Sequence, residues 1–498
     1  MNGHTTAQLD TLFPAPSPPP NTQCPQRWYG VNHETTAALQ KTLKKNHTKW
    51  HIFFNDRGFH NHIAHHTLAL YALGASAPVI EAAYELDSRH QRALFESPEA
   101  ITEENFIDHL GDEKFYKAYL TFFTNALLEK GAAATLEKFV FSDEYNYEAP
   151  NLKDGQSQPK MLVRFYDALM HTMIHVGYGL EFGLMGMVVE GLAQGAVHKG
   201  DAGIPLVEDT FKSLKSSGAV EVAAAAGRLA SLTLEQKPFY TQCEGQPTTG
   251  THAFSILQSM LADDRLTNIK APQTLLSTHT EAMDKYGAII AEHAASWTVD
   301  LSKPGELERK VEELSWVNAI FYAIGGLHLV TSSLFLPAVL AYLTPRAQVI
   351  CLRTYFSSSL TWWVATGLAR FDIPAFFSST STLPTPPRSS TAANPNPDTL
   401  PSATSPHAIT PNPWLPIIQT TIVHPNDHLC KLQRTLAHFE RVYGGRAPGY
   451  FKDSGLEGAE YLDGSLFVRA ATLTADRLGW MREGQEKKSF SFEGFYAK

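Results

Sequence analysis

Apolar side chains recur along most of this chain with the spacing of α-helices. In residues 59–75 the apolar positions Ile63, Leu70 and Leu73 fit a helical period better than a strand period. Gly74 is expected to end this helix, because glycine readily takes the left-handed conformation of a helix C-terminus. No long stretch alternates between apolar and polar residues as a half-buried strand does.

The same period continues through the rest of the sequence. Residues 113–141 are expected to form two helices broken at Gly131, and further helical patterns follow up to the C-terminal region. There is no internal repeat. The pattern therefore predicts an all-α fold, with the helices packed as a single large bundle domain.

Two segments lack the pattern. Residues 1–26 are polar and proline-rich, and residues 378–413 are a low-complexity run of Ser, Thr and Pro. Such compositions bury too little apolar surface to order themselves, so both segments are expected to be disordered. The helical domain then consists of residues 27–377 and 414–498, with the insert between its two parts.

One segment resembles a membrane span. Residues 319–343 contain no charged residue and are long enough to cross a bilayer. They include Gly325, Gly326 and Pro337, which favour a buried pair of helices over a membrane anchor. The N-terminus lacks the basic-then-apolar order of a signal peptide, so a cytoplasmic protein is expected.

The composition narrows the classes of binding partner that we expect. The 498 residues carry a formal charge of −9, whereas nucleic acid and anionic membranes both attract a basic surface. We therefore expect neither as a partner. The four cysteines show no CxxC spacing and are expected to be free thiols in a reducing compartment.

Histidines are concentrated in the first helical segment. Four of the chain's 21 histidines, namely His60, His62, His65 and His66, lie within seven residues. On a helix, His62 and His66 would share one face. Neutral imidazole is a common metal ligand, and helical proteins build metal sites from side chains on facing helices. The alternative for each histidine is a solvated or core side chain.

A second histidine pair lies in residues 161–197, a helical segment rich in Gly and Met. His171 and His175 are four residues apart. Gly177 and Gly179 resemble the start of a dinucleotide-binding GxGxxG motif, but no strand precedes them, so that reading is rejected. These glycines are expected to allow close approach of a neighbouring helix or ligand.

Two further motifs complete the set. His328 lies in the uncharged segment, and His428 and Lys431 are three residues apart at the start of a predicted helix. Pro425 suits the first turn of that helix, and Asp427 suits the positive end of its dipole. In isolation, Lys431 and His428 would be ordinary surface residues.

Together, HNHIAHHTLALYALGA, LMHTMIHVGYGLEFG, GLHLVTSSLF and HPNDHLCKL resemble the motifs of the questin oxidase-like family. The resemblance covers roughly residues 27–480. It implies one mononuclear non-haem iron bound by four histidines and by a lysine carboxylated by CO₂. The ligands that it implies are His62, His171, His328, His428 and Lys431. His62 is preferred because it follows Asn61, while His60, His65 and His66 remain alternatives.

The resemblance also implies an activity. Members of the family oxidatively open anthraquinone rings, formally by Baeyer–Villiger-type oxidation, so an O₂-dependent oxygenase acting on an aromatic polyketide is expected. Tyr178, Glu181 and Thr331 are expected to be catalytic residues near the ligands, with Tyr178 and Glu181 as proton donor and base. For each of these residues, a purely structural role is the alternative.

Other functions stay open at this point. The oxygenase could use NADPH without a metal, directly or through a reductase partner, although no nicotinamide or flavin fold is recognisable. The metal could activate water, in a hydrolase or a cyclase. The chain could also bind a polyketide without catalysis.

Overall fold

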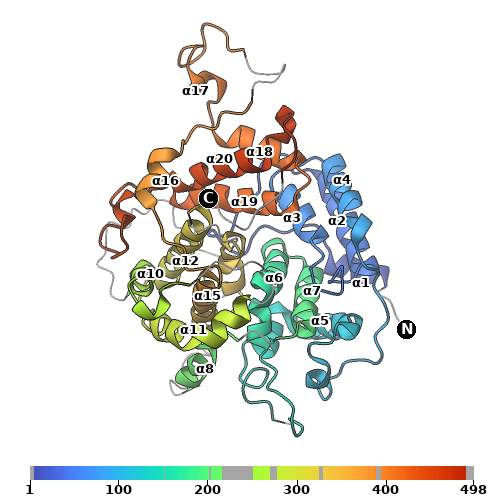
Figure 1. Cartoon of the computed structure of the whole chain (residues 1–498). Coiled ribbons are helices and arrows are strands. Elements are labelled where there is room, and N and C mark those ends of the chain that lie inside the picture. Colours follow the sequence, from blue (N-terminus) through green and yellow to red (C-terminus); the bar gives the residue numbers. More distant parts are fainter. Residues whose placement is uncertain are drawn as a thin grey trace.

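The computed structural model describes residues 5–150, 152–200, 203–215, 251–269, 278–324, 329–387 and 394–488. Figure 1 shows an assembly of packed helices, and the described residues include no β-strand. The predicted all-α fold is therefore confirmed. The α-helices are α1 Thr6–Leu12, α2 His33–Lys49, α3 Ile63–Ala72, α4 Ala77–Asp87, α5 Tyr116–Phe139, α6 Met161–Phe182, α7 Met185–Val197, α8 Val207–Lys215, α10 Ala253–Leu261, α11 Thr278–Ala295, α12 Glu306–Ala323, α13 Val330–Ser333, α14 Leu336–Leu340, α15 Pro345–Ala365, α16 Ile373–Ser379, α17 Pro406–Ile409, α18 Trp414–Val423, α19 Asp427–Tyr443 and α20 Leu466–Leu478. Short 3₁₀ helices occupy Ser88–His90, Phe106–His109, Glu113–Phe115, Asp264–Leu266, Ala459–Tyr461 and Met481–Glu483.

Helices α6 and α7 form the centre of the molecule. Almost all of α7 and the second half of α6 are buried, as expected for helices that are apolar on every side. They pack closely because glycines leave room. A Cβ on Gly191 of α7 would lie 2.6 Å from Cγ2 of Val176, and one on Gly179 of α6 would lie 2.7 Å from Cγ2 of Val188. The expected role of the glycines in close helix approach is thus confirmed.

The N-terminal segment differs from the prediction. Residues 5–26, expected to be disordered, include α1, which begins at a capping box between Thr5 and Gln8. Leu12 and Phe13 are fully buried. The ring of Phe13 fills the space where a side chain at Gly186 would lie, since a Cβ there would be 2.2 Å from the ring. Leu12 and Phe13 therefore anchor this segment on the helices, although its composition is otherwise polar.

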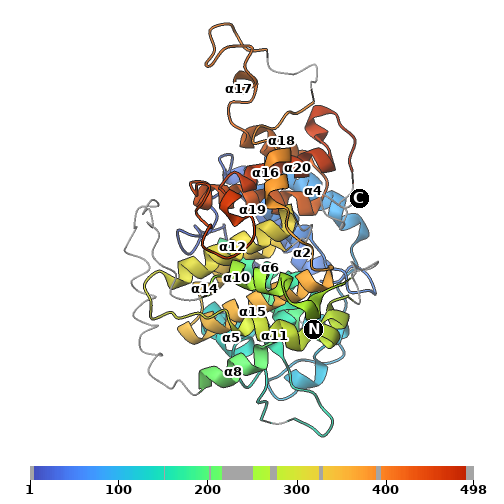
Figure 2. The ribbon, with the colours of Figure 1, turned by 60° about the vertical axis from the view of Figure 1, so that its left-hand side comes forward.

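The Ser/Thr/Pro insert projects from the helical body, as Figures 1 and 2 show around α17. Most of its described residues are exposed or half-buried. After the insert, α18, α19 and α20 pack on one another, and α19 also packs against α3 from the beginning of the chain. Helices on the two sides of the insert therefore contact each other, while the domain bounds and the disorder of the insert stay predictions.

The uncharged segment 319–343 is not one long helix. It includes the end of α12, the four-residue α13 and the five-residue α14. Among the described residues, no helix combines the length and the apolarity that crossing a membrane requires. In α5, Gly131 has a φ of 78° and interrupts the helix where the sequence predicted a break.

Candidate metal centre

His62 lies at the beginning of α3 rather than within it. Asn61 fixes this start: its Oδ1 accepts the backbone N–H of Ile63 at 3.0 Å, and its Nδ2 donates to Oδ1 of Asn46 at 2.8 Å. The backbone N–H of His66 donates to the carbonyl oxygen of His62 at 2.9 Å, as in a helix, but the two imidazoles have different partners. His66 instead pairs with Asp87 of α4, whose Oδ2 lies 2.8 Å from Nδ1 of the imidazole.

His171 follows an irregular turn in α6. Residues 167–170 depart from helical dihedrals, and Ala168, Leu169 and Met170 all have positive φ, at 48°, 57° and 62°. Each non-glycine residue in this region costs about 1–3 kcal/mol, and such strain is concentrated at functional sites. The turn places the carbonyl oxygen of Ala168 against Nδ1 of His171. The sequence predicted an uninterrupted helix here.

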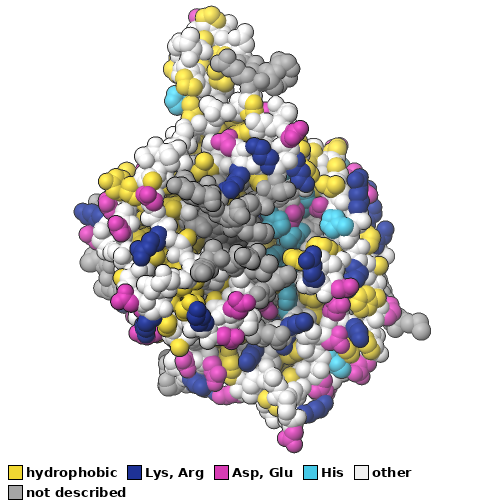
Figure 3. Space-filling model, in the orientation of Figure 1, with side chains coloured by type: hydrophobic (Ala, Val, Ile, Leu, Met, Phe, Trp, Pro, Cys, Tyr) yellow, Lys and Arg dark blue, Asp and Glu magenta, His cyan; other side chains and the backbone are white. Residues whose placement is uncertain are grey.

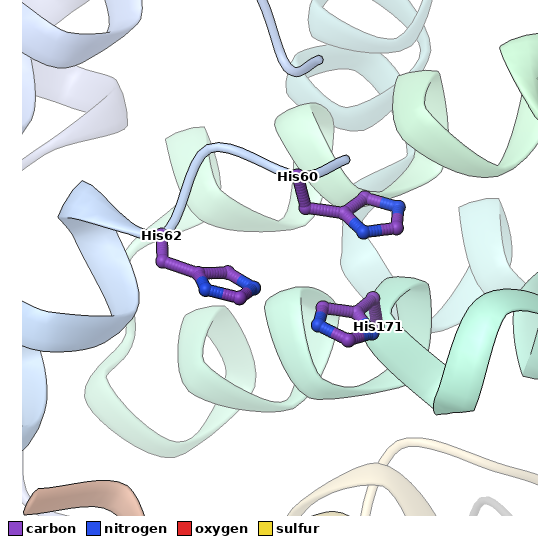
Figure 4. Close-up of side chains that lie close together, drawn as sticks. All are labelled: His60, His62 and His171. Carbon is purple, nitrogen blue, oxygen red and sulfur yellow. The ribbon is translucent and has the colours of Figure 1, made fainter. Parts of the chain in front are cut away.

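The two segments bring three imidazoles together. His60, His62 and His171 each offer a ring nitrogen, and these atoms lie within 4.8 Å of one another. Figure 4 shows the first two on the chain before α3 and the third on α6, with the rings side by side. The ring centroids of His62 and His171 are 5.0 Å apart at an interplanar angle of 7°.

Asp427 connects this group to α19. Its Oδ2 lies 2.6 Å from Nδ1 of His62 and 3.4 Å from Nζ of Lys431, and its Oδ1 lies 3.0 Å from Nδ1 of His428. His62, Asp427 and His428 form a second group whose donor atoms lie within 4.8 Å. Burial opposes ionisation of Asp427, but His428, Lys431 and His62 outweigh it and hold its pKa well below the usual range.

These contacts fit a metal. The carboxylate of Asp427 accepts the Nδ1–H of His62, which leaves a lone pair on Nε2, and this buried atom has no partner among the described residues. In His171 the backbone carbonyl likewise occupies Nδ1. Metal-binding histidines use such partners for the other ring nitrogen. Burial, with the nearby charge of Lys431, lowers the pKa of His62 to about 3, so its ring stays neutral and able to bind a cation.

His328, the remaining expected ligand, lies outside the described residues, so its role stays a prediction. Leu329 directly precedes α13, which contacts both α6 and α19. Thr331 lies in α13 with its buried Oγ1 unpartnered among the described residues. This short helix is thus held between the two helices that carry His171 and His428.

The expected acid–base residues lie further along α6. The ring of Tyr178 stacks on His65 at 5.3 Å, and the Arg434 guanidinium lies 5.5 Å from its centroid. Glu181 forms a buried ion pair with Arg434. Burial raises the pKa of Glu181, although the charge of Arg434 opposes this. Tyr178 therefore lies beside the histidines, whereas the pairing of Glu181 favours the structural alternative.

Sequence reasoning did not predict two contacts of this site. Asp427, expected at the start of a helix and near the ligands, contacts both His62 and His428, and its position directly before His428 was the available signal. His175 was paired with His171 by spacing, but its Nε2 instead contacts Glu190 at 2.8 Å. Figure 3 shows histidines gathered on one face of the molecule, and the His428 side chain is 34% exposed.

The model of the questin oxidase-like family matches residues 59–436, which include every histidine named above. The chain belongs to this family. Among similar proteins, the questin oxidase of Aspergillus terreus is 22% identical over 468 residues, which cover 88% of each chain. The Baeyer-Villiger monooxygenase AacuH of Aspergillus aculeatus is 33% identical over 180 residues. The Baeyer-Villiger oxidase AgnL3 of Paecilomyces divaricatus is 33% identical over 179 residues.

These last two matches are partial. Each spans about a third of the relative, 34% of the first protein and 36% of the second, and a similar share of this chain. The family relationship of the chain thus rests on the model that matches from the beginning of the histidine segment to the middle of α19. The imidazole cluster and the Asp427 contacts belong to this matched region.

Proposed function

We propose that this chain is a non-haem iron-dependent oxygenase that opens a ring of an anthraquinone-type aromatic polyketide in secondary metabolism. One observation carries the proposal: His62 donates its Nδ1–H to Asp427 and keeps a buried Nε2 lone pair beside His171 and His60. The names of the relatives, questin oxidase and Baeyer-Villiger oxidases, supply the reaction class.

The proposed ligands are His62, His171, His328, His428 and Lys431, the last carboxylated by CO₂. Imidazoles with one anionic oxygen would suit iron. When bound there, iron would supply activation of O₂. Lys431 is buried, and its Nζ lies 3.4 Å from Oδ2 of Asp427, so carboxylation requires this pair to separate.

Other residues would orient the ligand rings and stabilise charge on the substrate. Asp427 fixes the tautomer and the ring orientation of His62, and the irregular turn before His171 fixes that ring. The Oγ1 of Thr331 is a free buried donor for charge that develops on a substrate oxygen, and it has no described partner to compete for it. Tyr178 would act on the site through its ring contact with His65, not through a contact with His62.

The test is turnover of an anthraquinone such as questin by purified protein, with and without Fe²⁺ and O₂. We expect product only when both are present. Incorporation of one atom from ¹⁸O₂, with consumption of NADPH and release of water, would identify a monooxygenase. Incorporation of both atoms without NADPH would identify a dioxygenase.

Three results would contradict the proposal. Turnover by iron-free protein with NADPH would indicate a metal-free monooxygenase, acting directly or with a reductase partner. Anaerobic turnover would indicate a hydrolase or a cyclase. Tight binding of the anthraquinone without product under any condition would indicate a non-catalytic polyketide-binding protein.

A further inference from the structure

A chain of four buried ionisable side chains leads away from the candidate metal centre. Nδ1 of His47 lies 2.7 Å from Oε1 of Glu190, and Oε2 of Glu190 lies 2.8 Å from Nε2 of His175. Nδ1 of His175 in turn lies 3.0 Å from Nε2 of His65. The four residues come from α2, α7, α6 and α3, and each is at most 3% exposed. The proposed mechanism uses none of these hydrogen bonds.

The carboxylate sets the direction of the hydrogen bonds. Burial disfavours the charge on Glu190, but the hydrogen bonds from His175 and His47 outweigh it and lower its pKa to about 2. An ionised carboxylate only accepts hydrogen bonds. Nε2 of His175 and Nδ1 of His47 must therefore both carry protons.

The next hydrogen bond follows from the tautomer of His175. A neutral imidazole protonated on Nε2 has a lone pair on Nδ1, so it accepts a hydrogen bond from Nε2–H of His65. In a neutral ring with its proton on Nε2, the second nitrogen carries no proton. The remaining nitrogen of His65, Nδ1, then carries a lone pair. It is buried and has no partner among the described residues.

This lone pair belongs to a ring next to the metal centre. The imidazole of His65 lies between His62, at a centroid distance of 5.5 Å, and Tyr178, at 5.3 Å. A buried acceptor without a donor is costly, by about 1–3 kcal/mol, so such an atom is suited to a donor that arrives with a ligand. Close packing of α6 and α7 at Gly191 keeps Glu190 against His175.

We propose that Glu190 is a positioning residue that acts through His175 to hold His65 as the Nε2–H tautomer, with Nδ1 free to accept a hydrogen bond from a phenolic hydroxyl of the bound ligand. The choice of a hydroxylated aromatic ligand rests on the proposed function. The tautomers of His47, His175 and His65 do not rest on it, so the tautomers and the choice of ligand can fail separately.

Neutron diffraction from deuterium-exchanged crystals of the full chain tests the tautomers without any reaction. We expect deuterium on Nε2 of His65, on Nε2 of His175 and on Nδ1 of His47. Deuterium on Nδ1 of His65, or on both nitrogens of His175, would overturn the proposal. This measurement uses the unaltered protein, so it decides even if a variant fails to fold.

The Glu190→Gln variant tests the consequence for binding. An amide that donates to Nε2 of His175 reverses the hydrogen bonds, so Nδ1 of His65 becomes a donor. The unaltered protein should bind 2-hydroxyanthraquinone about fivefold to tenfold more tightly than 2-methoxyanthraquinone, the value of one hydrogen bond. Glu190→Gln should lose this preference. Asp87→Asn should keep it, because Asp87 pairs with His66, which is not one of the four hydrogen-bonded residues.

Equal preference in the unaltered protein and in Glu190→Gln would overturn the role of Glu190, whether or not the protein oxidises anthraquinones. Turnover of anthraquinone without any hydroxyl preference would leave the oxygenase intact and refute only the role of His65. Correct tautomers and a Glu190-dependent preference, in a protein without oxygenase activity, would refute the proposed function alone.

Discussion

His62 and Asp427 come from opposite ends of the chain and meet at 2.6 Å, between Nδ1 of the imidazole and Oδ2 of the carboxylate. The contact joins the loop before α3 to the first turn of α19. It directs the other nitrogen of His62 toward the neighbouring imidazoles as an acceptor, since only one nitrogen of a neutral ring carries a proton.

Asp427→Asn should weaken Fe²⁺ binding by roughly 10–100-fold, because loss of such a carboxylate lowers ligand basicity and loosens ring orientation. Anaerobic competition titration with a chromophoric chelator measures this. Asp87→Asn is the matched control, since it removes a buried carboxylate from His66 at a similar distance. If both variants bind iron equally well, Asp427 does not support the metal.

His171→Ala and His328→Ala should each reduce the iron content of the purified protein by roughly tenfold or more, with helicity preserved. Elemental analysis and circular dichroism measure the two effects. The control is His66→Ala, which removes a buried histidine of the segment 60–66 that pairs with Asp87 instead. Full iron occupancy in His328→Ala would exclude this residue as a ligand.

Lys431→Ala should lower turnover roughly tenfold or more while costing little stability, because water can take the vacant ligand position. Carboxylation itself has a direct signature. After incubation with ¹³C-bicarbonate, the unaltered protein should show a carbamate resonance that Lys431→Ala lacks. Its absence from iron-loaded wild-type protein would leave Asp427 as the anionic group of the site.

The stability of iron-free protein should decrease below pH 6.5. The folded-state pKa of His62 is about 3, mainly through burial, against about 6.5 in the unfolded chain. Between these values the unfolded state binds more protons, so stability rises with pH and is lost on acidification. This residue contributes up to about 1.4 kcal/mol per pH unit. Urea denaturation at several pH values should show a shallower slope for His62→Gln; an unchanged slope would contradict the assignment.

Gly191→Ala should destabilise the protein by about 1–3 kcal/mol, because the new Cβ would lie 2.6 Å from Cγ2 and 2.9 Å from the backbone nitrogen of Val176. The helices must separate to accept it. Gly445→Ala is the control, since a Cβ there meets nothing within 4 Å. Thermal unfolding of the two variants measures the difference, and similar midpoints would mean that α6 and α7 tolerate the change.

Much of the fold was predictable because it depends on local patterns. Helical spacing of apolar residues predicted the all-α class, Gly131 marked the break in α5, and Gly74, with a φ of 80°, follows α3. The order of the N-terminal segment was not predictable. It depends on contacts of Leu12 and Phe13 with helices distant in sequence, which composition does not reveal.

By itself, the sequence determined the helical class and the motifs from which His62, His171 and His428 were chosen. Only the tertiary structure decided how those motifs contact each other. Spacing paired His62 with His66 and His171 with His175, whereas the fold pairs His62 with Asp427 and His175 with Glu190. The reason is physical: helical periodicity fixes which residues share a face, but the partner of a buried imidazole is whichever polar group another helix places within hydrogen-bonding distance.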